Sequence, residues 1–191
     1  MEQNVSMKIN ELPSPTWNWL KVNETPIKWS NKIEPCEIAA EGDAVSAETE
    51  QLSDIETGAG READAIFATE NTAKYQILAD NAGQDKTVRL HISGKKDAHT
   101  AGCVEIVAKE NSTLTVVMDS RVAPDATKEE DSTAEASLAV RVRMKVESGA
   151  SVRLVQVQMP QEHETLLSDI GGNLIGEGAK VEYIQLFLGK G

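Results

Sequence analysis

A repeated strand pattern in the second half of the chain most constrains its fold. Residues 149–157 (GASVRLVQV) align without a gap with residues 178–186 (GAKVEYIQL). Residues 111–117 (NSTLTVV) fit the same template earlier in the chain, at a longer interval. Each copy starts with small turn-forming residues and continues with alternating aliphatic residues, which is typical of β-strands. Such a recurrence indicates a solenoid, in which each coil buries its apolar face against the next coil.

Alternation of apolar and polar residues dominates the chain from Phe67 onward. In residues 138–147 (LAVRVRMKVE), large apolar side chains alternate with mostly charged ones, which predicts a strand with one solvent-exposed face. Weaker versions of the pattern predict further strands at residues 88–92, 103–107, 114–118, 152–159 and 181–188. A β-sandwich of short strands would give similar alternation, so it remains the alternative to a solenoid. The acidic residues 123–135 are expected to form a surface loop that accounts for the longer repeat interval.

The first third of the chain differs from this pattern and is expected to be an irregular, partly helical leader. It contains all three tryptophans, and Ser14 and Pro15 fit the N-cap and first position of a short helix. Residues 39–64 are acidic and small, which predicts a mobile segment or a weak helix. We therefore divide the chain into a leader with an acidic linker, residues 1–65, and a β-rich core, residues 66–191.

Charge and hydropathy exclude several classes of function. The 191 residues include 31 acidic and 19 basic side chains, a net charge of −12, whereas nucleic-acid affinity depends largely on Lys and Arg. The longest nearly apolar stretch, residues 181–188, is far shorter than a membrane span. The start of the sequence lacks an apolar secretion segment, and the two cysteines form no CxxC motif, which indicates the reducing cytoplasm.

Residue types that could bind metal or act as nucleophiles are scattered. The spacing of His91, His99 and His163 provides no set of converging metal ligands. Cys103 falls in a predicted strand and is interpreted as a small buried hydrophobic residue, whereas Cys36 beside a proline has no clear place. We assign no catalytic, metal-binding or cofactor-binding residue.

Three other local motifs have a structural and a functional interpretation. The acidic clusters at residues 129–131 and 162–164 could take part in acid–base chemistry, but are expected to be solvated loop charges. Residues 171–178 (GGNLIGEG) lack the Lys-Ser/Thr pair of a P-loop and are expected to form solenoid turns. Trp17 and Trp19 are expected to pack against the strands, or alternatively to anchor a partner.

Several segments, taken in order, resemble one protein family. They are residues 12–23 (LPSPTWNWLKVN), 104–107 (VEIV), 114–117 (LTVV), 168–171 (SDIG), 176–179 (GEGA) and 185–189 (QLFLG). Together they resemble the SufB/SufD family of iron–sulfur cluster assembly proteins, and the tryptophan-containing leader is more similar to SufD. The resemblance covers most of the chain, although residues 39–64 contribute little to it.

The resemblance implies a mainly β fold, a right-handed parallel β-helix core preceded by a short helical N-terminal region. It also implies a non-enzymatic cytoplasmic scaffold that works with SufB-like proteins and the ATPase SufC, the iron–sulfur cluster being handled by the full complex. Family members continue for roughly as many residues again, so the sequence looks like an N-terminal portion. None of the family's functional residues maps onto it.

The strand that ends near Leu188 is expected to expose apolar side chains and unpaired edges, which predicts self-association. Two functions from other classes remain as alternatives. One is a carbohydrate-active enzyme built on a β-helix, and the other is a β-sandwich binding module.

Overall fold

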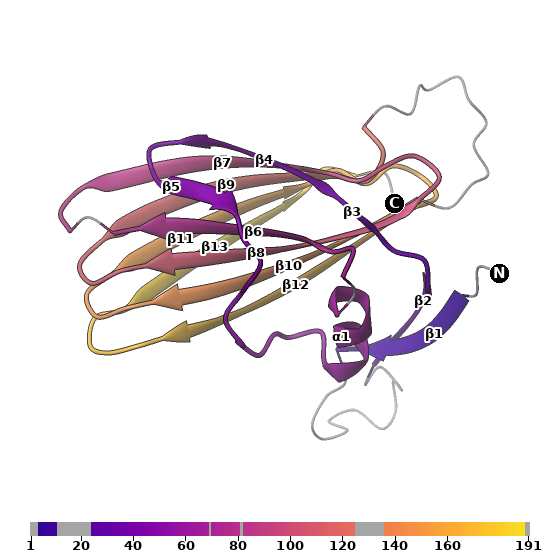
Figure 1. The fold of residues 1–191 in the computed structure, drawn as a ribbon, viewed down its shortest axis with the longest axis horizontal. Helices are drawn as coiled ribbons and strands as arrows, with labels where there is room; N and C mark the ends of the chain where they lie inside the picture. The colour runs from indigo at the N-terminus through magenta and orange to yellow at the C-terminus, as the bar shows by residue number, and fades with distance from the viewer. Residues whose placement is uncertain (1–3, 11–23, 69, 81, 125–135, 190–191) are drawn as a thin grey trace.

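Two β-sheets packed against each other make up most of the protein (Figure 1). The computed structural model describes residues 4–10, 24–68, 70–80, 82–124 and 136–189. Within these ranges there is one helix, α1 (Arg61–Phe67). The strands are β1 (Asn4–Ile9), β2 (Thr25–Ser30), β3 (Glu34–Pro35), β4 (Glu37–Gly42), β5 (Val45–Glu48), β6 (Ala73–Ala79), β7 (Asp85–Ser93), β8 (His99–Ala108), β9 (Thr113–Arg121), β10 (Ala136–Val146), β11 (Ser151–Gln158), β12 (Glu164–Leu174) and β13 (Lys180–Phe187).

Successive strands alternate between the two sheets. Sheet I has the order β12-β10-β8-β6-β5, and sheet II has the order β13-β11-β9-β7-β4. From β6 to β13, every pairing within a sheet is parallel and joins strands two apart in the chain. β4 and β5 join the first strand of each sheet antiparallel. The protein is therefore mainly β, with two mixed sheets.

The sequence repeat corresponds to the strand register. Ser151 of β11 pairs with Lys180 of β13, as the alignment of residues 149–157 with residues 178–186 places them. Thr113 of β9 pairs with Ser151, in agreement with the earlier copy of the template. All six strands predicted by alternation are present. Parallel pairing one repeat apart therefore places equivalent side chains next to one another along each sheet.

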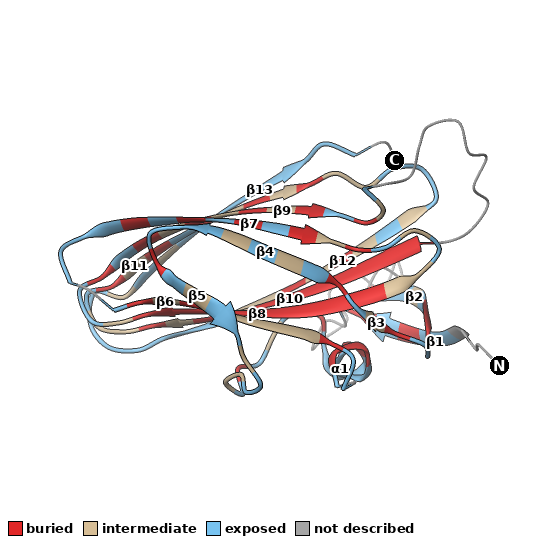
Figure 2. Ribbon diagram, turned by 45° about the horizontal axis from the view of Figure 1, so that its top comes forward, coloured by how far each residue is buried: buried red, intermediate tan, exposed pale blue. Residues whose placement is uncertain are grey.

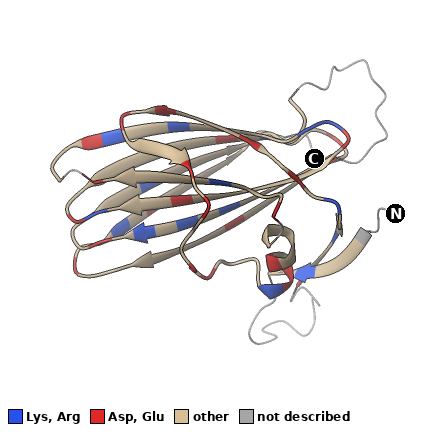
Figure 3. Ribbon diagram, in the orientation of Figure 1, with Lys and Arg blue, Asp and Glu red and all other residues tan. Residues whose placement is uncertain are grey.

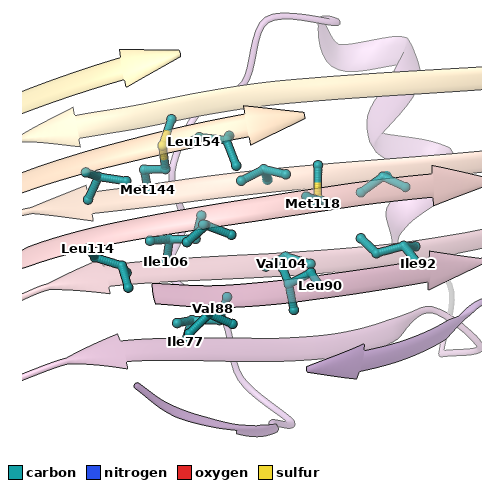
Figure 4. Packing of buried hydrophobic residues seen from close by; sticks show 14 of the residues in the cluster. Ile77, Val88, Leu90, Ile92, Val104, Ile106, Leu114, Met118, Met144 and Leu154 are labelled. Atoms are coloured by element: carbon teal, nitrogen blue, oxygen red, sulfur yellow. The ribbon is translucent and has the colours of Figure 1, made fainter. Parts of the chain in front are cut away.

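The space between the sheets is filled by apolar side chains (Figure 4). Ile77, Ile106 and Met144 lie in register on three adjacent strands of sheet I. Leu90 and Met118 do the same on sheet II and are fully buried. Burial of such a side chain contributes about 1.5–3 kcal/mol, so this interior is the main source of stability.

The outer face of sheet I is covered, and here one prediction was wrong. The alternation in residues 138–147 predicted a solvent-exposed face, but the outward Arg141 of β10 is only 3% exposed. The β1–β2 hairpin and α1 pack onto this face through Trp29, Ile66 and Phe67. Alternation reports that one face is polar, but the polar face is here buried under another part of the chain (Figure 2).

The leader also differs from its prediction. Residues 39–64 were expected to be mobile or weakly helical, but they contain most of β4, all of β5 and an extended segment that leads to α1. β4 and β5 pair with β7 and β6, which explains why a segment with few large apolar side chains is ordered. The expected helix start at Ser14 and Pro15, both Trp17 and Trp19, and most of the expected loop 123–135 lie outside the described residues.

Candidate functional site

Residues 49–60, which we call the strap, cross the outer face of sheet I between β5 and α1 (Figure 1). The amide of Gly58 donates a hydrogen bond to the carbonyl oxygen of Ile170 in β12, at 3.3 Å. A Cβ atom at the next residue, Gly171, would lie 2.1 Å from the carbonyl oxygen of Glu56. Glycine at this position therefore allows the strap to approach the strand closely.

A buried ion pair holds the second half of the strap. Asp169 of β12 accepts hydrogen bonds from Arg141 Nε at 2.7 Å, the Thr57 hydroxyl at 2.7 Å and the Ala59 amide at 2.8 Å. The side chains of Asp169 and Arg141 are 0% and 3% exposed. The Arg141 guanidinium lies 4.2 Å from the centre of the Phe67 ring, and its Nη2 is 2.8 Å from a carboxylate oxygen of Asp64 outside hydrogen-bond geometry.

A second buried carboxylate holds the first half of the strap. Glu105 of β8 accepts a hydrogen bond from the Ser53 amide at 2.8 Å and another from Gln76 Nε2 at 2.6 Å. Arg143 of β10 donates to the carbonyl oxygen of Ser53 at 2.8 Å. Burial acts to raise the pKa of Glu105, but the hydrogen bonds from Ser53 and Gln76 and the nearby Arg143 charge outweigh it and lower the pKa.

A cleft of about 890 Å³ separates the strap, α1 and the outer face of sheet I. Arg141 and Arg143 line its floor, and acidic side chains that include Asp54, Glu56 and Asp64 line its rim, a mixture of charges visible in Figure 3. The carboxylates of Asp169 and Glu105 are occupied by hydrogen bonds from the chain itself. The arrangement therefore acts chemically as a clamp on the strap, with no carboxylate directed at a bound molecule.

The two cysteines lie near each other in the fold but belong to different apolar clusters. Cys36 follows β3, donates its amide to the Ala101 carbonyl at 3.1 Å and lies in the interior between the sheets. Cys103 of β8 faces the cluster under α1. Burial, with the neighbouring Cys103 charge, raises the pKa of Cys36 to about 12, and burial raises the pKa of Cys103. Both are buried free thiols, which confirms the interpretation of Cys103 as a buried hydrophobic residue.

The three histidines are on separate elements. His91 of β7 is half exposed and lies 2.5 Å from Asp119 of β9. His99, at the start of β8, contacts the Ser137 hydroxyl at 2.5 Å and packs near the Trp29 ring. His163 is exposed in the turn before β12. Within the described ranges, no three His, Cys, Asp or Glu side chains are grouped to hold a metal ion.

The remaining motifs are placed as follows. Gly171 and Gly172 were expected in a turn but belong to β12, where they pass under the strap and beside Met144. Gly176 and Gly178 do form the β12–β13 turn, with φ of +93° and +76° that glycine adopts readily. The acidic residues 162–164 form a surface turn into β12, and residues 129–131 lie outside the described part of the chain.

Comparisons of this chain with protein-family models, curated proteins and solved structures found no match. In the described part of the chain, no helix combines the length and the apolar character needed to cross a membrane.

The buried carboxylates Asp169 and Glu105 were missed by sequence reasoning. A signal for Asp169 was present, because it follows Arg141 by one repeat and is its register partner. His91 and Asp119, Arg153 and Glu182, and Lys109 and Glu147 are also opposite charges separated by one repeat, and each pair is in contact. A search for opposite charges at the repeat spacing would have found these pairs, since parallel register places them side by side.

We expect Glu105→Gln to lower the free energy of unfolding by about 1–3 kcal/mol at pH 7, because the charge-assisted hydrogen bonds to the strap are weakened. A carboxylate with a lowered pKa stabilises the fold above its ordinary pKa of 4.5 and loses this effect as the pH falls through its folded pKa. The difference between Glu105→Gln and the parent should therefore shrink at acidic pH. Urea unfolding followed by circular dichroism from pH 7 to pH 3 measures it.

The control is Glu182→Gln, which removes a 55% exposed carboxylate from its pair with Arg153 and should cost less than about 1 kcal/mol. A Glu105→Gln penalty that stayed constant down to pH 3 would contradict the proposed clamp.

Proposed function

We propose that this chain is a SufD-like scaffold component of a SUF iron–sulfur cluster assembly complex, with no enzymatic activity of its own. Residues 66–191 are proposed to form a right-handed parallel β-helix core, preceded by residues 1–65. The observation that supports this best is the parallel pairing of β6 to β13 between strands one repeat apart in two sheets. Stacked two-strand coils of this kind are consistent with the β-helix that the sequence resemblance implies.

The pairing direction bears on the β-sandwich alternative. Sandwiches are typically built from antiparallel strands joined by hairpins and Greek keys. Here the strands from β6 to β13 pair in parallel, and the chain passes to the other sheet after each strand. This pairing favours stacked coils over a sandwich binding module.

The clamp bears on the carbohydrate-active alternative. An enzyme of that kind would need carboxylates that a sugar can reach on one strand face. On the outer face of sheet I, Glu105 and Asp169 are 2% and 1% exposed and accept hydrogen bonds from the strap. The strap occupies the face that such a substrate would need, and so favours a scaffold role.

The proposal implies a cytoplasmic protein whose partners are SufB-like and SufC-like proteins. The iron–sulfur cluster is the cargo of the complex, and we assign no residue of this chain to it. The net charge of −12 fits a protein that works with other proteins rather than with nucleic acid.

Binding to these partners tests the proposal. The tagged 191-residue chain is mixed with purified SufB-like and SufC-like proteins of the same genome, with an unrelated acidic β-protein as the control for charge. We expect the SufB-like protein to be retained by the chain and not by the control. If a chain extended at its C-terminus binds both proteins, the main determinants lie beyond residue 191. If neither form of the chain retains either protein, the proposed function is wrong.

A further inference from the structure

Exposed apolar side chains gather at one end of the two sheets. Of nine large hydrophobic side chains that are exposed in the described residues, seven lie on or just after β12 and β13. They are Leu174, Ile175, Tyr183, Ile184, Leu186, Phe187 and Leu188. Figure 2 shows the contrast between exposed β13 and its more buried neighbours β9 and β11. A contiguous apolar surface of this kind indicates an interaction site.

Part of this surface continues the protein interior. Tyr183 and Phe187 of β13 are in register with the buried Leu154 and Gln158 of β11, and so occupy inward-facing positions. They are 41% and 68% exposed because no described strand lies beyond them. Leu174 extends the buried position of Val146 in the same way on sheet I. The surface is therefore a cross-section of the apolar interior.

The backbone imposes a second requirement on any occupant. The outer edges of β12 and β13 have no partner strand among the described residues, and they belong to two sheets that face each other across about 10 Å. Residues 170–176 and 183–189 at these edges contain no charged side chain. An occupant must supply two uncharged strand edges at the same spacing, together with apolar side chains between them.

The opposite end of the sheets does not meet this requirement. Its outermost strands, β4 and β5, have six and four residues, against eleven and eight for β12 and β13. Residues 37–50 contain five acidic side chains and no basic one. Head-to-tail stacking would press these carboxylates against apolar side chains, which is costly because an unpaired charge would lose its hydration.

The β12–β13 edge of a second copy supplies the matching surface by symmetry. We propose that two copies of this chain bind each other through the β12–β13 edge around a twofold axis. The twofold axis pairs the edge strands antiparallel and uses the surface of both copies at once, so the assembly closes at two and forms no filament. This inference goes beyond the proposed function and does not depend on it, since it uses neither a SufB-like nor a SufC-like partner.

Analytical ultracentrifugation of the full 191-residue chain, from low micromolar to near-millimolar concentration, tests the proposal. We expect a reversible monomer–dimer equilibrium without larger species. Hydrogen exchange gives a second readout, because the outward amides of β13 should gain protection as concentration rises while those of β4 and β5 should not. A monomer at every concentration, or a ladder of larger oligomers, would overturn the proposal.

A matched pair of variants separates the two ends of the sheets. Phe187→Lys places a charge in the proposed interface and should raise the dimer dissociation constant at least about tenfold. Val45→Lys changes a side chain of similar exposure, 59% against 68%, at the opposite end and should leave that constant within about twofold. Thermal unfolding confirms that each variant folds. Equal weakening by both variants, or weakening by Val45→Lys alone, would contradict the assignment of the interface.

Discussion

We expect Asp169→Ala to lower the free energy of unfolding by about 3–5 kcal/mol, the cost of removing one partner of a buried ion pair. The substitution leaves the Arg141 guanidinium buried and takes away the acceptor of the Thr57 hydroxyl and the Ala59 amide. Because the same carboxylate holds the strap, hydrogen exchange at Ala59 should also become faster. Urea unfolding and exchange measured on one preparation check both effects.

Asp64→Ala is the matched control, because Asp64 contacts the same guanidinium with a carboxylate that is 58% exposed. Its loss should cost less than about 1 kcal/mol. The double substitution Arg141→Met with Asp169→Leu should recover much of the loss, since it leaves no unpaired charge in the buried site. Similar costs for Asp64→Ala and Asp169→Ala would show that burial of the pair does not determine its contribution.

The strand positions and their register were predictable because the repeat has a direct physical meaning. The alignment of residues 149–157 with residues 178–186 is the same as the pairing of β11 with β13. The side chains that repeat are those that face the interior, where each must fit against its equivalent on the next strand of the sheet. The pattern therefore encoded both the alternation and the pairing.

The cover on sheet I was not predictable from the same signals. Alternation in β10 distinguishes two faces, but it does not state whether the polar face contacts water or another part of the chain. Arg141 is buried because Asp169 and the strap satisfy its charge, and these partners are distant from it in the sequence. β12 was missed for a related reason, since Gly171 and Gly172 resemble a turn and are needed for close packing.

The acidic leader shows how tertiary contacts can override composition. Residues 39–64 have few large apolar side chains, so their own sequence gives little reason for order. They are ordered by backbone pairing of β4 and β5 and by the carboxylates of Glu105 and Asp169, which accept hydrogen bonds from backbone amides of the strap. These acceptors are on sheet strands distant in sequence, and a local pattern carries no information about them.

The second large effect is expected at the centre of the interior, where Ile106→Ala should lower the free energy of unfolding by about 2–5 kcal/mol. Ile106 is fully buried and lies in register between Ile77 and Met144 on sheet I (Figure 4). Because strands on both sides fix these neighbours, they have little freedom to close around the cavity, so the cost should fall in the upper part of this range. Urea unfolding at pH 7 measures the change.

Ile106→Val provides the graded control, because it removes one methylene and should cost only about 0.5–1.5 kcal/mol. Met144→Ala, one repeat along on β10, provides the test of stacking. If adjacent strands share one packed interior, the double variant should depart from additivity, since both substitutions open the same cavity. Strictly additive costs would mean that the two side chains do not pack against each other, and would contradict the register of β8 on β10.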